Sequence, residues 1–458
     1  MFATRRLTDR DAGVARLQQL DRLLPSWATP ARLFLLLYLF SALICLTFGF
    51  FVGFRDTPAQ LDQDEQEYLG IALAIAKGDP ILSARRTLGF PFVIAGIRTL
   101  TTNLWFLQSA LCLIYAFSAP LLQLLVRRLT GSMVAGLASG LAFAVWPTAI
   151  FYGTSLYSES VALPVVLLAL YCLPLGFEPL QRGWVRGALL SGLLLGVATH
   201  VRPMYLLFLP FLCLIILVET GRVMAAARIA VVALLAYAAV ILPWSIYVST
   251  TFHRPILVSS NGGETLAGGL TPALLNHNST MKLGSGRVTW VGPGKWLAMS
   301  DTGYLSEAET RLPYDQQDPL LRARAVEWIK AHPDQAAYLE LCKLSYMWGI
   351  YPIEANGPAQ LLFGNIPIVV LLVAGVAAFA LRPELRVRFA RLWTPVLFVS
   401  SVALISWGSW RFRQTADAGL IAFCVIVFLQ TVPIAAWWSR IAAPRAPRQG
   451  GNATSGAK

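Results

Sequence analysis

The sequence contains ten apolar runs, most of them close to the length that crosses a lipid bilayer. A helix needs roughly 20 mostly apolar residues to cross about 30 Å of hydrocarbon. Apolar residues make up 56% of the 458 and charged residues only 13%, so an all-α polytopic membrane protein is predicted. The ten predicted spans lie near residues 31–53, 104–126, 132–151, 156–176, 186–201, 204–219, 226–249, 360–381, 393–410 and 415–438.

The arginines gather on one side of these runs. Short cytoplasmic loops are enriched in Lys and Arg, so clusters such as Arg127-Arg128 place the N-terminus inside. The short loops of the other side then hold only Arg202, Arg411 and Arg413. The net charge of +13 is therefore a topology signal, and nucleic-acid binding is rejected. Residues 31–53 are expected to be a retained first span because the segment before them is polar.

This orientation predicts two substantial loops on the external face, which can form one site. The first, residues 54–103, lies within a transmembrane module of residues 31–249. The second, residues 250–358, is the longest polar stretch and precedes C-terminal transmembrane helices at 359–438. Residues 1–30 and 439–458 are expected in the cytoplasm.

Local patterns predict helices in both loops. In the first loop, residues 65–77 place Tyr68 and Ala72 on one helical face, and residues 88–97 are apolar but too short to span. In the second loop, glycine pairs predict turns at 261–263 and 268–269. Asp318 is expected to cap a helix over 319–331, and Pro333 to begin another helix that reaches about Trp348.

Four carboxylates stand directly after the first predicted span: Asp62, Asp64, Glu65 and Glu67. Such a cluster is expensive to place near lipid, so it requires either aqueous exposure or a function. No disulfide framework accompanies it, because five of the six cysteines fall inside apolar runs.

Motifs along the chain resemble a family of membrane enzymes. Asp64-Glu65-x-x-Tyr68 is followed by Arg85-Arg86-x-Leu88-Gly89-Phe90-Pro91. This resembles the first external loop of GT-C integral-membrane glycosyltransferases, the group that includes protein mannosyltransferases and the aminoarabinose transferases of lipid A. The resemblance continues, in order, at Ser158-Glu159, Arg202-Pro203, Pro243-Trp244, 259–263, His332-Pro333 with Lys343, and Arg411-Phe412-Arg413.

The resemblance implies a GT-C-like fold and a sugar donor carried on a polyprenyl phosphate. It implies a membrane glycosyltransferase, acting on the external face of what is expected to be a bacterial cytoplasmic membrane. The acceptor stays open among a lipid, a glycan and a protein, because the extra C-terminal soluble domain of the lipid A enzymes has no counterpart here. Membrane lipids are expected as further partners.

Asp64 matches the family's catalytic position. An acceptor hydroxyl that attacks the anomeric carbon must lose a proton, and one carboxylate can take it as a general base. The alternative is that Asp64 caps a helix beginning at Glu65. Asp62 is the second candidate base. A divalent cation held by Asp62, Asp64 and Glu159 is a further option that no ligand spacing requires.

The leaving lipid phosphate calls for cationic partners near the outer membrane surface. We expect them among Arg85, Arg86, Arg202, Arg411 and Arg413, with Tyr68 and Glu159 completing the substrate-binding set. The alternative for each arginine is contact with phospholipid headgroups or snorkelling. Glu159 alternatively pairs with Arg202.

A lipid-linked sugar flippase or another transporter is the rival functional class. Many transporters carry internal repeats and place their sites at the bilayer midplane. This sequence shows no repeat that relates two halves, and its ionisable residues lie at the ends of spans. A non-catalytic scaffold is the second rival, and it would not need Asp64 beside clustered external arginines.

Overall fold

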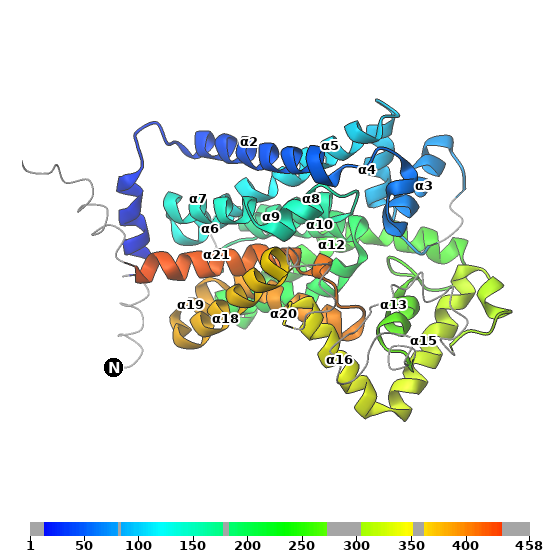
Figure 1. Cartoon of the computed structure of the whole chain (residues 1–458). Helices are drawn as coiled ribbons and strands as arrows, with labels where there is room; N and C mark the ends of the chain where they lie inside the picture. The colour runs from blue at the N-terminus through cyan, green and yellow to red at the C-terminus, as the bar shows by residue number, and fades with distance from the viewer. Residues whose placement is uncertain (1–12, 81–83, 177–182, 273–303, 351–360, 433–458) are drawn as a thin grey trace, which may run out of the picture.

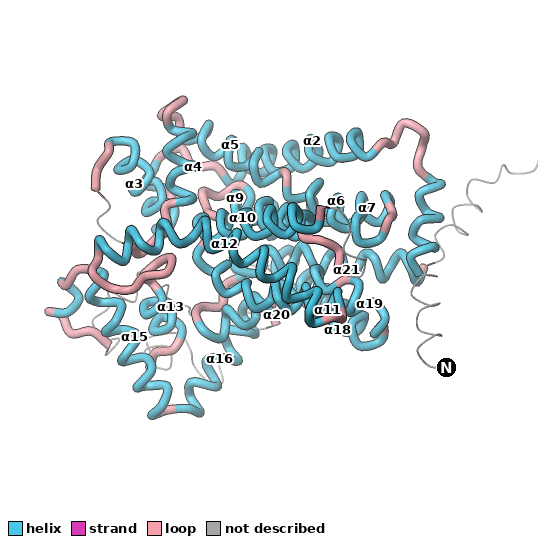
Figure 2. Tube along the Cα trace, turned by 180° about the vertical axis from the view of Figure 1, so that it is seen from behind, coloured by secondary structure: helices cyan, strands magenta, loops and turns pink. Residues whose placement is uncertain are grey.

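The computed structural model describes residues 13–80, 84–176, 183–272, 304–350 and 361–432, and this part of the chain is helical without strands (Figures 1 and 2). The long apolar helices form one bundle, and shorter helices gather at one end of it. The predicted all-α fold class is therefore confirmed. The tail at 439–458, residues 1–12 of the N-terminal segment, and parts of the second loop lie outside the described residues.

Eleven labelled helices precede the second loop. They are α2 (Pro30–Phe48), α3 (Gln63–Lys77), α4 (Gly89–Arg98), α5 (Leu104–Ala116), α6 (Ser118–Thr130), α7 (Met133–Ala144), α8 (Pro147–Gly153), α9 (Glu159–Cys172), α10 (Trp184–Val201), α11 (Leu209–Thr220) and α12 (Val223–Thr251). The later helices are α13 (Gly262–Gly269), α15 (Tyr314–Ala331), α16 (Pro333–Met347), α18 (Ile366–Leu381), α19 (Pro383–Arg388), α20 (Ala390–Ile405) and α21 (Gln414–Thr431).

Within the described residues, six helical segments are long and apolar enough to cross a membrane, and the chain is a multi-pass membrane protein. A seventh span results if α7 and α8, bent by 64° at a short break, cross together. Three further predicted runs correspond to α9, α18 and α20, which are apolar but shorter. Each predicted run thus contains a helix, while the count of ten crossings stays a prediction.

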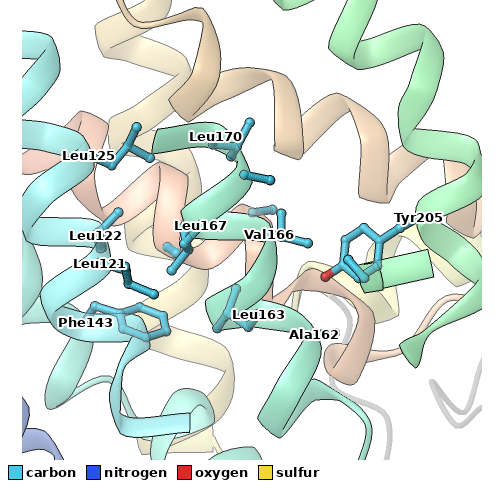
Figure 3. Packing of buried hydrophobic residues seen from close by; sticks show 14 of the residues in the cluster. Leu121, Leu122, Leu125, Phe143, Ala162, Leu163, Val166, Leu167, Leu170 and Tyr205 are labelled. Carbon is cyan, nitrogen blue, oxygen red and sulfur yellow. The ribbon is translucent and has the colours of Figure 1, made fainter. Parts of the chain in front are cut away.

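Helix α9 lies at the centre of the bundle and packs against α5, α6 and α10. Its Leu163, Leu167 and Leu170 are buried, and Figure 3 shows them opposite Leu121, Leu122 and Leu125 of α6. A helix that is apolar on all sides belongs in an interior. This central position places Glu159, the first residue of α9, at one end of the bundle interior.

The first predicted loop forms α3 and α4, which pack against each other and, through α4, against α10. Gly89 allows this close approach, because a Cβ there would lie 2.5 Å from the backbone of His200. The predicted helix at 65–77 exists but begins at Gln63, and it ends at Gly78 in the left-handed conformation that favours glycine. Tyr68 and Ala72, which share one helical face, are buried in the structure.

The second loop places α13, α15 and α16 at the same end of the bundle as α3 and α4 (Figure 1). Two turn predictions are wrong here, because both glycine pairs lie within α13. The predicted cap at Asp318 is also wrong. Helix α15 begins earlier, at Tyr314, and the Asp318 carboxylate instead accepts the backbone N–H of Glu264 at 2.9 Å. The helix predicted from Pro333 is confirmed as α16.

Candidate active site

Asp62, not Asp64, caps helix α3, which corrects the capping alternative for Asp64. The Asp62 side chain accepts the backbone N–H of Glu65 at 3.1 Å, and the Glu65 carboxylate accepts the N–H of Asp62 at 2.9 Å. This reciprocal capping box satisfies the first turn. Glu65 also accepts the N–H of Leu156 at 2.8 Å, which fixes α3 beside the segment that leads into α9. Asp64 is therefore left available for other partners.

Asp64 lies between two arginines that are far away in sequence. Its Oδ1 accepts from Arg86 Nη2 at 2.5 Å, and its Oδ2 accepts from Arg411 Nη1 at 2.5 Å. Arg86 comes from the segment between α3 and α4, and Arg411 from the short helix η9 (Trp410–Arg413) before α21. The tertiary structure thus joins two predicted phosphate partners to the predicted base.

Arg411 also joins Asp64 to a second carboxylate, that of Glu159. The Glu159 side chain is buried, accepts from Arg411 Nε and forms an ion pair with Arg202. The predicted pairing of Glu159 with Arg202 is therefore observed. The Arg411 guanidinium stacks over the ring of Tyr157 at 3.8 Å, which orients it further.

Arg85 faces a different set of partners from its neighbour Arg86. Its guanidinium binds both carboxylate oxygens of Glu264, at 3.0 and 2.6 Å, and lies 3.0 Å from Glu67. Tyr314 donates to the same Glu264. Arg85 therefore connects the segment between α3 and α4 to α13 and α15, so the two predicted loops are in direct contact. Glu67 also accepts from Arg86 at 2.9 Å.

The other candidates support the cluster or lie apart from it. The ring of Tyr68 lies under Arg86 at 5.2 Å and packs edge-on against Phe90. Arg413 is fully buried, lies 3.1 Å from Asp417, and donates to the carbonyl of Met347 at 2.6 Å. The structure thus separates Arg413 from Asp64, although Arg411 is only two residues away.

The arginines change the acidity of Asp64. Burial alone would raise the pKa of this carboxyl, but the positive charges and hydrogen bonds of Arg411 and Arg86 outweigh it and hold the pKa well below its usual range. Asp64 is therefore ionised and neutralised by two cations while these pairs are intact. A carboxylate in this state is a weak base. Its pKa would rise if one of the arginines bound another anion instead.

The ligand set suggested for a divalent cation does not assemble. In the part of the chain that the structure describes, no three or more His, Cys, Asp and Glu residues are grouped so that they could hold a metal ion. Asp62 is used as a helix cap, and the guanidinium of Arg411 lies between Asp64 and Glu159. The space between these carboxylates is thus filled by a cationic side chain.

Three residues of the cluster were not predicted as site residues from the sequence. Glu67 lies one helical turn after Asp64, and this i, i+3 spacing could have indicated a shared face. Tyr157 lies directly before the Ser158-Glu159 motif, and only its contact with Arg411 shows that it belongs to the cluster. Glu264 sits among glycines in the second loop, where only the tertiary contact with Arg85 shows its position.

No family model matches the sequence, and no curated protein matches it. Solved structures do match. The Pmt1–Pmt2 protein O-mannosyltransferase of S. cerevisiae, bound to its sugar donor, is 16% identical over 56% of this chain and 38% of its own, with a TM-score of 0.41. The oligosaccharyltransferase AglB of Archaeoglobus fulgidus is 13% identical over 90% of this chain and 52% of its own, with a TM-score of 0.48.

A third match is ArnT from Cupriavidus metallidurans, 15% identical over 88% of this chain and 77% of its own, with a TM-score of 0.42. The structural neighbours are GT-C glycosyltransferases. These neighbours include the two kinds of GT-C enzyme that the motifs resembled. The chain spans only about half or less of the first two proteins. Identities of 16% or less and TM-scores below 0.5 carry no information about what this chain binds or transfers.

Proposed function

We propose that this GT-C-like protein transfers a sugar from a polyprenyl-phosphate donor to an acceptor hydroxyl at the external face of the membrane. The observation that carries the proposal is the position of Asp64 between Arg86 and Arg411. A carboxylate able to take a proton and cations able to hold a phosphate are the two groups that this reaction needs, and they are in direct contact here.

In the proposed reaction the acceptor oxygen forms a bond to the anomeric carbon, while the bond from that carbon to the phosphate oxygen breaks. The acceptor proton moves to Asp64, and the polyprenyl phosphate leaves with the bonding electrons. Arg86 and Arg411 stabilise the charge that develops on the departing phosphate, which is the electrostatic contribution expected of preorganised donors. Planar guanidinium groups suit this task because they bind phosphate oxygens bidentately.

The same pairs make Asp64 responsive to the donor. While Arg86 and Arg411 hold Asp64, the low pKa of Asp64 makes it a poor proton acceptor. A donor phosphate that recruits these guanidinium groups withdraws positive charge from Asp64, and the basicity of Asp64 rises. Neither arginine loses all its carboxylate partners, because Glu67 remains beside Arg86 and Glu159 beside Arg411.

The site lies at the external end if the arginine-rich ends of the helices face the cytoplasm. A bacterial cytoplasmic membrane, with the cluster facing outward, is the location that this arrangement favours. The acceptor would then be a lipid, a glycan or a protein on that side. Glu264, with its partners Tyr314 and Arg85, borders the cluster on the side of the second loop.

The test uses purified protein in lipid nanodiscs with a panel of polyprenyl-phosphate sugars. Release of undecaprenyl phosphate, the lipid bound in another crystal structure of the C. metallidurans ArnT, is measured with the wild-type protein, with Asp64→Asn and with Asp79→Asn. Asp79 is an exposed aspartate of the same loop and serves as the matched control. Release that depends on Asp64 but not on Asp79 supports the proposal. Movement of intact sugar-lipid across reconstituted vesicles without cleavage would assign the protein to the flippase class instead.

A further inference from the structure

Lys343 of α16 is fully buried, which is rare for a lysine and requires polar partners. Its Nζ donates to Glu340 at 2.8 Å and to the carbonyl of Ser406 at 3.1 Å, and it lies 3.5 Å from the carbonyl of Leu404. The two carbonyls belong to the C-terminal end of α20, where a positive charge is favourable. A buried charge at this junction holds α16, from the second loop, against the end of α20.

Two further bonds connect α16 to the segment that follows α20. Trp410 Nε1 donates to the carbonyl of Tyr346 at 2.8 Å, and Arg413 Nη1 donates to that of Met347 at 2.6 Å. Gly408 lies so close to α16 that a Cβ there would be 2.6 Å from the carbonyl oxygen of Lys343. The segment from 404 to 413 is therefore fixed along one side of α16.

Arg411 lies in this segment, between the two anchored residues Trp410 and Arg413. Its backbone N–H is capped by Ser409, and its side chain reaches Asp64 and Glu159. Its position relative to Asp64 thus depends on where α16 holds the segment. We propose that Lys343 is a positioning residue, which acts through α16 and the 404–413 segment to place the Arg411 guanidinium against Asp64. The inference depends on the proposed function only in the second of the two tests below, which measures turnover of the donor.

The first test needs no donor. Thermal unfolding midpoints are measured for Asp64→Asn, Arg411→Gln and the double variant, because residues in contact show non-additive effects. The same set is repeated with Lys343→Met, which keeps most of the side-chain volume, and with Lys330→Met, an exposed lysine of α15, as control. We expect the non-additivity between Asp64 and Arg411 to shrink toward zero with Lys343→Met and to persist with Lys330→Met. Unchanged non-additivity with Lys343→Met would overturn the inference, whether or not the protein is a transferase.

The second test measures kcat/KM for the polyprenyl-phosphate donor. Lys343→Met should lower it about tenfold or more, the scale of one hydrogen bond to a charged group, and should cause no further loss when Arg411 is already Gln. If Lys343→Met lowers kcat/KM by the same factor with Arg411 present and with Arg411→Gln, Lys343 has a purely structural role and the inference is overturned. Trp410→Phe, which removes the bond to Tyr346 and keeps a ring, decides the matter if Lys343→Met does not fold. Trp410→Phe should lower kcat/KM in the wild-type background and cause no further loss when Arg411 is already Gln. An equal loss in both backgrounds would again overturn the inference.

Discussion

Arg411 Nη1 lies 2.5 Å from Asp64 Oδ2, although 347 positions of sequence separate the two residues. One residue follows the first apolar helix, and the other precedes α21. Their contact brings the segment after the first apolar helix and the segment before α21 together at one end of the bundle. The predictions below follow from this pair and from the residues that hold it.

Asp64→Asn should separate catalysis from folding. Asp62 provides the cap of α3, and Arg86 and Arg411 keep Glu67 and Glu159 as partners, so the protein is expected to fold normally, with its unfolding midpoint lowered only by the loss of the two Asp64 ion pairs. Sugar transfer should fall by roughly 10²–10⁴-fold, the usual worth of a general base. Turnover assays beside thermal unfolding check this.

Asp62→Ala should give the opposite pattern. Loss of a helix cap costs about 0.5–2 kcal/mol, so stability falls while transfer decreases less than in Asp64→Asn. If Asp62→Ala abolishes transfer in a protein of normal stability, Asp62 and not Asp64 takes the proton.

The pH dependence of kcat/KM should show the effect of the Arg411 charge on the pKa of Asp64. The pKa of Asp64 is lowered in the folded protein, so the stabilising ion pairs are present above the usual carboxyl range near pH 4 and are lost as the pH falls toward the lowered value. Arg411→Gln removes one cause of this lowering, and the acid limb of the profile should move to higher pH. The limb should stay in place for Arg311→Gln, since Arg311 is exposed on the second loop and pairs only locally with Glu307.

Arg85 and Arg86 should behave differently despite being neighbours. Arg85→Ala should loosen α13, because it removes the bidentate contact with Glu264, and Glu264→Gln should have an effect that is not additive with it. Hydrogen exchange over residues 262–269 measures this loosening. Arg86→Ala should mainly raise the KM for the donor while exchange over 262–269 is unchanged. Equal effects of the two variants on KM would contradict the separation of roles.

Topology is tested with single cysteines in a cysteine-free background. Gln60, Lys330 and Gln19 are exposed positions on the first loop, the second loop and the N-terminal segment. A membrane-impermeant reagent should label the first two in intact cells and should reach position 19 only after permeabilisation. Labelling of position 19 together with protection of 60 and 330 would place the cluster in the cytoplasm.

Periodicity and composition determined the helices. Each of the ten apolar runs contains at least one helix, because a segment in lipid must satisfy its backbone hydrogen bonds internally, and this requirement acts locally. The motif around Asp64 and the arginines likewise indicated the candidate residues from sequence alone. Where a short loop helix begins was less predictable. Asp62 and not Asp64 caps α3. Asp318 accepts a backbone N–H from the first turn of α13 and does not cap α15, because a side-chain oxygen can accept any backbone N–H within reach.

Only the tertiary structure decided which charges meet. Arg411 and Arg413 look equivalent in the sequence, but a helical turn directs them to different surroundings, so one contacts Asp64 and the other Asp417. Arg85 and Arg86 divide in the same way between Glu264 and Asp64. Ion pairs depend on distances of a few ångströms between residues hundreds of positions apart, and those distances are set by helix packing. The sequence therefore determined Asp64 and its arginines as candidate groups, and the packing of the helices decided which of them meet and added Glu67, Tyr157 and Glu264 to the cluster.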